Sequence, residues 1–174
     1  MSDTSRPANW RRLTGPANWI ATGAAALPVV LAALWALEVQ NWFGLLVYKE
    51  QFLAVMLACG LVTGFLNVKA RRGEAGDHVP WYDWLLSLVA IAACGYVVVN
   101  YDWLVYELST LDPVRITLGA TLILAIFEAT RRMIGWTLII VASFFILYAR
   151  FGDMMPGIFA VPPSSWPRIV VYSY

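Results

Sequence analysis

The sequence has 174 residues, of which 60 % are hydrophobic and 13 % are charged, and its formal net charge is +1. A soluble domain usually carries about 25 % charged and 45–50 % apolar residues, so this chain has too little polar surface for water and its natural solvent is lipid. The near-zero charge, without a basic stripe interleaved with aromatic residues, argues against a nucleic acid partner. Cys59 and Cys94 both fall in apolar runs, where we expect them to pack as small hydrophobic residues.

The N-terminal part of the chain predicts a short polar tail followed by a first membrane helix. Residues 1–18 contain Pro7, Gly15 and Pro16, which disfavour helix, and Trp19–Leu37 then runs without a charge. A bilayer needs about 20 such residues. Arginines before an apolar stretch also occur in signal peptides, but the length of this stretch and the further runs behind it indicate a retained helix.

The middle of the chain predicts two more spans. Glu38–Gln51 is expected to be an interfacial aromatic segment, and Phe52–Val68 follows it as a second charge-free run. Lys69–Asp83 is the most polar loop, and Trp84–Val99 then forms the third run. Tryptophan and tyrosine at the ends of these runs are typical of the membrane–water boundary.

The region after residue 112 leaves two alternatives open. Ile116–Phe127 is short, and alone it is typical of a buried or re-entrant segment, whereas with its flanks and two snorkelling arginines it makes a short span. Met133–Ala149 is a fifth charge-free run. We expect two short spans joined by a tight turn at Glu128–Gly135, and one long, broken helix is the alternative. Residues 150–174, rich in glycine and proline, are expected to be irregular.

These runs predict an all-α fold, a polytopic transmembrane helical bundle of four to five spans. The distribution of basic residues sets its orientation, because cytoplasmic loops carry an excess of lysine and arginine. With five spans and a cytoplasmic N-terminus, the basic residues on the inside outnumber those on the outside. The inside set is Arg6, Arg11, Arg12, Lys69, Arg71, Arg72, Arg131 and Arg132, and the outside set is Lys49, Arg115, Arg150 and Arg168. We therefore expect the N-terminus inside and the C-terminus outside.

No catalytic constellation is visible, so we expect the chain not to be an enzyme and to hold no cofactor or metal. The one histidine, His78, lies in a charged loop near Asp77 and Asp83, where it is expected to be solvated. The sequence has no glycine-rich phosphate loop and no nucleophile elbow. The spans hold almost no ionisable groups, which usually mark a substrate path. The surface is therefore expected to pack against something larger.

One polar cluster near the end of the fourth run is the exception. Glu128 lies three and four residues before Arg131 and Arg132, so these side chains can pair on one helix face. The cluster has two interpretations: a salt-bridge clamp to a partner helix or to lipid head groups, or a charged turn that follows the positive-inside rule.

The same stretch carries a family resemblance. Glu128-Ala-Thr-Arg-Arg-Met-Ile-Gly-Trp136, followed by Tyr148-Ala-Arg-Phe-Gly152 and Pro156-Gly157, resembles the small-subunit-like N-terminal region of fused permeases of tripartite ATP-independent periplasmic (TRAP) transporters, TAXI type. Leu13-Thr14-Gly15 and Asp112 also match residues that this family favours. The motif-level similarity covers residues 112–170, and elsewhere it rests on hydropathy and spacing.

The resemblance implies a domain plan and a role. Residues 1–18 would be a cytoplasmic tail, 19–132 a four-helix small-permease-like domain, 133–149 a connector-like fifth span and 150–174 a periplasmic tail. In this family the small domain of a bacterial inner-membrane permease braces a large multi-helix transport domain and helps dock a periplasmic solute-binding protein. The implied partner interface comprises Glu128, Arg131, Arg132, Gly135 and Trp136.

The sequence departs from the family in one respect, because the large domain with its substrate and ion sites is not in this chain. No transport residue can therefore be carried over. Two functions follow: a non-catalytic scaffold subunit or domain of a TRAP-type secondary transporter, or an accessory structural subunit of another large membrane complex, such as an energy-converting assembly. In both, lipids and a large membrane protein are the expected partners.

Overall fold

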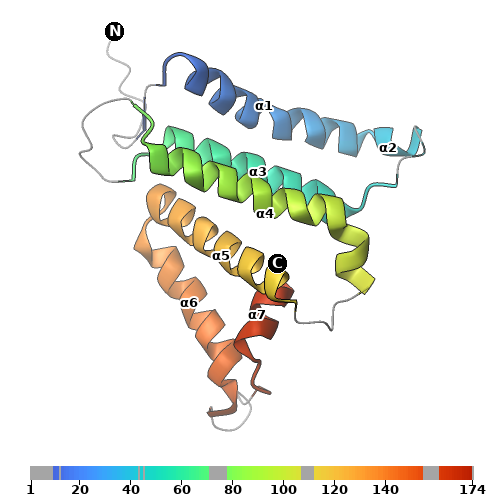
Figure 1. Cartoon of the computed structure of the whole chain (residues 1–174), viewed down its shortest axis with the longest axis vertical. Coiled ribbons are helices and arrows are strands. Elements are labelled where there is room, and N and C mark those ends of the chain that lie inside the picture. Colours follow the sequence, from blue (N-terminus) through green and yellow to red (C-terminus); the bar gives the residue numbers. More distant parts are fainter. Residues whose placement is uncertain are drawn as a thin grey trace. The chain divides into compact units, whose positions relative to one another are not determined.

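The computed structural model describes residues 10–11, 13–42, 44, 46–70, 78–106, 112–154 and 161–173, and these contain helices and no strand (Figure 1). The helices are α1 (Pro16–Ala36), α2 (Val39–Trp42), α3 (Lys49–Asn67), α4 (Trp81–Tyr106), α5 (Pro113–Met133), α6 (Trp136–Phe151), the 3₁₀ helix η1 (Gly152–Met154) and α7 (Trp166–Ser173). Five segments of this described part are long and apolar enough to cross a membrane: α1, α3, α4 as far as Tyr101, α5, and α6 continued to Met154. The predicted all-α polytopic fold is confirmed.

The chain divides into two compact units, residues 1–101 and 102–174. Each unit is described by itself below. The predicted domain boundaries at residues 18, 132 and 149 stay predictions.

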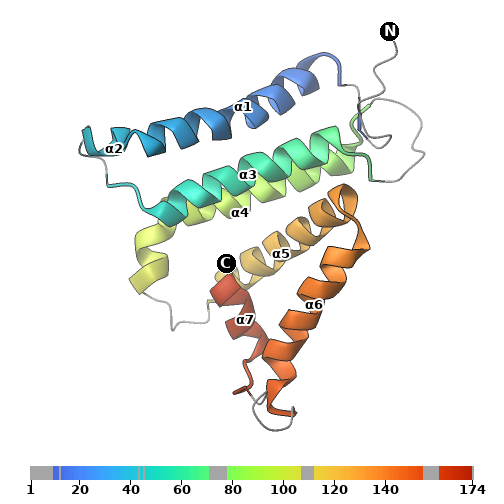
Figure 2. The ribbon, with the colours of Figure 1, turned by 180° about the vertical axis from the view of Figure 1, so that it is seen from behind.

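The first unit is built on α1, α3 and α4, and Figures 1 and 2 show α3 and α4 side by side. Its core lies between α1 and α3, where Ala21, Val62 and Leu66 are buried. Two contacts hold the opposite end of the unit together. The ring of Trp35 on α1 stacks on a phenylalanine of α3 at 4.5 Å between centroids, and Gln51 Nε2 on α3 donates a 2.8 Å hydrogen bond to a carbonyl of α4.

Helix α4 is interrupted where the third apolar run was predicted to end. Asn100 has non-helical backbone angles (φ −109°, ψ 22°), and its side-chain amide donates to the carbonyl of Tyr96 at 3.1 Å. A side chain that competes for backbone groups in this way favours the end of regular helix. The membrane-crossing part of α4 accordingly ends at Tyr101.

The second unit contains α5 and α6, which are joined by a turn of only Ile134 and Gly135. The prediction of two spans in this region is confirmed, and the alternative of one broken helix is wrong. The turn is tighter than predicted, because Glu128 and the two arginines belong to the last turns of α5. The predicted fourth span ended before Glu128 because it was defined by the absence of charged residues. In the structure Glu128 pairs with Arg131 and Arg132, so the helix continues to Met133.

The prediction of an irregular C-terminal tail is wrong for Trp166–Ser173, which forms α7 and packs against α5 and α6. Proline was read as a helix breaker, but Pro167 is the second residue of α7, where its missing N–H costs nothing. Val171 is 2 % exposed, so one side of this short helix is buried. The packing of one apolar side against α5 and α6 therefore stabilises a helix here, although the segment contains a proline.

Candidate functional site

The charged cluster predicted from the sequence forms at the end of α5. Glu128 Oε2 accepts from Arg131 Nε, and its Oε1 accepts from both Arg131 Nη2 and Arg132 Nε, each at 2.7 Å. The pair with Arg131 is bidentate, the geometry in which guanidinium and carboxylate bind most strongly. Arg132 has a side chain only 2 % exposed, whereas Glu128 and Arg131 are 28 % and 29 % exposed. One carboxylate thus pairs with two arginines at the C-terminal end of α5, where the helix dipole favours positively charged side chains.

Gly135 and Trp136 lie in the turn that follows this cluster. Gly135 has φ 108° and ψ −168°, a conformation that is essentially restricted to glycine. Its N–H donates to the carbonyl of Thr130 at 3.1 Å, which closes α5. Trp136 begins α6 and is 64 % exposed, so its indole is available at the end of this helix. All five predicted interface residues therefore lie between the last turns of α5 and the first residue of α6.

The second motif stretch, Tyr148–Gly152, lies at the opposite end of α6. The carbonyl of Gly152 accepts from the N–H of Val161 at 3.1 Å, and the carbonyl of Ala149 accepts from Ser164 N at 3.1 Å. A Cβ at Gly152 would lie 3.1 Å from Val161 Cβ, tighter than an ordinary van der Waals contact, so a larger residue here would require Val161 to shift. The third motif, Pro156-Gly157, lies outside the described residues.

The two described motif stretches thus fix α6 at both ends. Between them, the side chains of the helix are incompletely covered by the rest of the chain, and no residue of α6 is buried. Its exposed side chains are large and apolar, including Ile140, Phe144 and Phe145, each about 60 % exposed or more. In a membrane this surface faces lipid or another protein helix.

A second polar centre, in the first unit, was missed by the sequence analysis. Arg11 Nη1 donates to Asp83 Oδ2 at 2.6 Å, and both side chains are fully buried. The same Nη1 lies 3.2 Å from the carbonyl oxygen of Phe65 and 3.4 Å from that of Leu66, at the end of α3. Arg11 N donates to the carbonyl of Asn67 at 2.8 Å.

This centre connects three segments. Arg11 precedes α1, its carbonyl acceptors end α3, and Asp83 lies in the first turn of α4. The guanidinium also meets the negative end of the α3 dipole, which is favourable for a cation. No sequence spacing reveals this pair, because its members are 72 residues apart and each lies in a stretch that resembles an ordinary polar flank.

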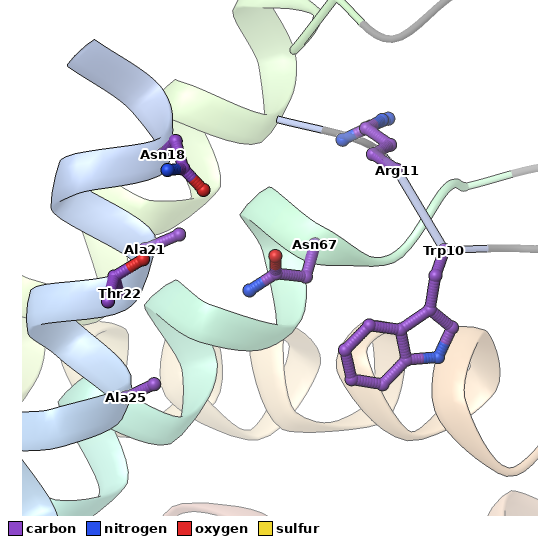
Figure 3. A pocket seen from close by; sticks show the side chains of 7 residues that line it. All are labelled: Trp10, Arg11, Asn18, Ala21, Thr22, Ala25 and Asn67. Carbon is purple, nitrogen blue, oxygen red and sulfur yellow. The ribbon is translucent and has the colours of Figure 1, made fainter. Parts of the chain in front are cut away.

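Beside this centre lies a pocket of about 380 Å³ between α1, α3 and the segment before α1. It is lined by Trp10, Arg11, Asn18, Ala21, Thr22, Ala25 and Asn67. Figure 3 shows the amide of Asn67 directed from α3 toward α1, with Ala21 and Ala25 on the facing side. The volume is that of a small ligand site.

The other residues considered from sequence show no assembled chemistry. Cys59 and Cys94 are buried free thiols, as predicted. His78 is exposed, and Asp77 lies outside the described residues. In the part of the chain that the structure describes, no three His, Cys, Asp or Glu side chains gather as metal ligands would.

No protein-family model, no curated protein and no solved structure matches this chain. The resemblance to TRAP permeases therefore rests on its motif residues and, outside residues 112–170, on hydropathy and spacing. The structure places two of the motif stretches at the two ends of α6. Of the other described motif residues, Gly15 is the N-cap of α1 and Asp112 is the N-cap of α5.

Proposed function

We propose that this chain is a non-catalytic scaffold subunit or domain of a TRAP-type secondary transporter in a bacterial inner membrane, where it braces a large transport domain. The observation that carries the proposal is α6, a membrane-crossing helix fixed at both ends by the motif stretches, with no residue buried in its own unit.

The physical argument concerns what such a helix can do in lipid. Apolar contact alone does not drive helices together in a bilayer, so association depends on surface complementarity, packing and polar contacts. A helix held by the Gly135 turn at one end and by the Gly152 contact at the other presents a fixed surface. A fixed surface loses little conformational entropy on binding, which favours a permanent interface with a larger helical partner.

The charges at the end of α5 support the orientation within this proposal. The cluster of Glu128, Arg131 and Arg132 carries a net positive charge at the end of a membrane span. Positive charge at span ends favours the cytoplasmic side. In the proposed orientation, the α5–α6 turn faces the cytoplasm, and the far end of α6, with α7, faces the periplasm, where a solute-binding protein would dock.

Site-specific photo-crosslinking in native membranes tests the proposal. A photoreactive amino acid is placed at Phe144 on α6, at 59 % exposure, and at Val29 on α1, at 69 % exposure, as the matched control. We expect the α6 position to crosslink to a multi-helix permease identified by mass spectrometry, and the α1 position to crosslink mainly to lipid.

Two other results would contradict the proposal. Crosslinking of Phe144 to subunits of an unrelated membrane complex would identify an accessory structural subunit there, with no transport role. Deletion of the chain without loss of uptake of the solute that a cognate binding protein delivers would remove the transport function altogether.

A further inference from the structure

The pocket between α1 and α3 contains polar groups that the described residues leave unpaired. The side-chain amide of Asn18 and the side-chain hydroxyl of Thr22 both line the pocket, and neither side chain makes a hydrogen bond within the described part of the chain. They lie four residues apart on α1 and therefore on one face of the helix.

Two other threonines within the membrane helices behave differently, although Thr130 and Thr137, like Thr22, make no side-chain hydrogen bond within the described residues. Thr63 donates from Oγ1 to the carbonyl four residues earlier at 2.8 Å, and Thr121 does the same at 2.6 Å. Back-bonding of this kind is the usual way in which a hydroxyl is satisfied within a membrane helix. Thr22 makes no such bond and opens onto the pocket instead. An unsatisfied hydroxyl in a membrane span is costly, which indicates that something else pairs with it.

The pocket lies at the membrane boundary and not at its centre. Asn18 is in the first turn of the span formed by α1, and Asn67 is the last residue of the span formed by α3. Trp10 at the pocket and the neighbouring Trp19 are 42 % and 79 % exposed, as expected of an interfacial aromatic belt. Ala21 and Ala25 on α1 add methyl groups to the same wall as Asn18 and Thr22, and Ala25 is the lining residue of α1 farthest from its first turn.

The donors and acceptors of the wall are balanced. Asn18 and Thr22 offer donors. Asn67 commits its Nδ2 to the carbonyl of Thr63 at 3.0 Å, so its oxygen is left as an acceptor. Among the described residues of the wall, Arg11 is the charged one, and its charge is offset by Asp83 at 2.6 Å. A wall of this kind suits a ligand that is itself both acceptor and donor, with no net charge.

We propose that this pocket binds one zwitterionic phospholipid of the phosphatidylethanolamine class. The phosphate oxygens accept from Asn18 and Thr22, the ammonium group donates to the Asn67 oxygen, and the first carbons of an acyl chain lie along Ala21 and Ala25. This inference does not depend on the transporter role, because it uses only contacts within residues 1–101.

Native mass spectrometry of the full chain, released from detergent with added phosphatidylethanolamine or phosphatidylglycerol of identical acyl chains, tests the site. Ala25→Phe fills the pocket from an exposed position on α1. Ala26→Phe is the matched control, since Ala26 is the next residue, is also exposed and does not line the pocket. Asn18→Ala combined with Thr22→Val removes the donors and leaves the pocket open.

We expect one tightly held phosphatidylethanolamine on the wild type and on Ala26→Phe, and its loss from Ala25→Phe. The double variant should bind it about tenfold more weakly, as for two lost neutral hydrogen bonds. Equal lipid binding by the two phenylalanine variants would overturn the site, and the double variant decides the question if Ala25→Phe does not fold. A preference for phosphatidylglycerol of tenfold or more would overturn the zwitterionic assignment. A bound polypeptide in place of lipid, present on the wild type and on Ala26→Phe and lost from Ala25→Phe, would overturn the proposal as a whole.

Discussion

Asp83→Asn is expected to be among the most destabilising single changes in the first unit, although it alters one atom of the side chain. The change removes the negative charge that faces Arg11 across 2.6 Å, where both side chains are fully buried. It leaves the guanidinium charge in place, close to the carbonyl oxygens at the end of α3. Removing one member of a buried ion pair is a well-defined source of large destabilisation.

The magnitude follows from the geometry. Two unit charges about 4 Å apart attract by about 4 kcal/mol at the effective dielectric suited to buried protein sites. Breaking a buried pair by removing one member costs about 3–5 kcal/mol by direct comparison with other proteins. We therefore expect Asp83→Asn to lower the free energy of unfolding by about 3 kcal/mol or more. The measurement is reversible unfolding of the full chain in mixed detergent micelles, followed by tryptophan fluorescence.

Two further variants make the test specific. Asp153→Asn removes an exposed carboxylate and should change the free energy by less than about 0.5 kcal/mol. The double variant Arg11→Met with Asp83→Leu replaces the pair by apolar groups and should recover most of the loss, because the desolvation cost disappears with the charges. If Asp83→Asn destabilises the chain no more than Asp153→Asn, the reasoning is refuted.

Three smaller changes test the packing of each unit by the same unfolding measurement. Gly135→Ala should cost about 1–3 kcal/mol, because its backbone angles are nearly exclusive to glycine, whereas Gly60→Ala, in a helix with open space around it, should be neutral or slightly stabilising. Gly152→Ala should cost about 1–3 kcal/mol, since its Cβ would press on Val161 at 3.1 Å; a neutral result would mean that the tail does not fold back there. Gln51→Leu should cost about 1–2 kcal/mol, because it loses the 2.8 Å hydrogen bond to α4 and the 3.1 Å bond that Gln51 Oε1 accepts from Tyr48 N. No change would contradict the pairing of α3 with α4 at that end.

Hydropathy was sufficient to predict the membrane-crossing helices, because few backbone conformations are stable in lipid. A buried backbone in hydrocarbon must satisfy its own hydrogen bonds, and a helix does so within one segment. Trp19–Leu37 and Phe52–Val68 therefore located α1 and α3 to within a few residues. The same reasoning predicted two spans here, joined by a turn at Glu128–Gly135, of which only Ile134 and Gly135 form the turn between α5 and α6.

The sequence failed where contacts between distant residues decide the structure. The fourth run looked short because Arg115 and Glu128 bound it, yet Arg115 is 4 % exposed and lies within α5. Arg11 and Asp83 resembled flanking polar residues, and only the fold brings them to 2.6 Å. Burial of charge depends on partners, and partners 72 residues apart leave no local pattern.

The cluster at the end of α5 gives the last prediction, which concerns an asymmetry between its members. Glu128 pairs with both Arg131 and Arg132, so Glu128→Gln would deprive two neighbouring cations of the carboxylate they share. Arg131→Gln would instead leave the ion pair of Glu128 with the buried Arg132 in place. We expect Glu128→Gln to cost about 1–3 kcal/mol, because the Arg132 side chain is only 2 % exposed and its charge is poorly screened. Arg131→Gln should cost less than about 1 kcal/mol, as for a partly exposed ion pair. Equal costs for the two variants in the unfolding assay would show that the carboxylate acts as a single surface pair, and the cluster would then carry no more than the ordinary charge of a membrane boundary.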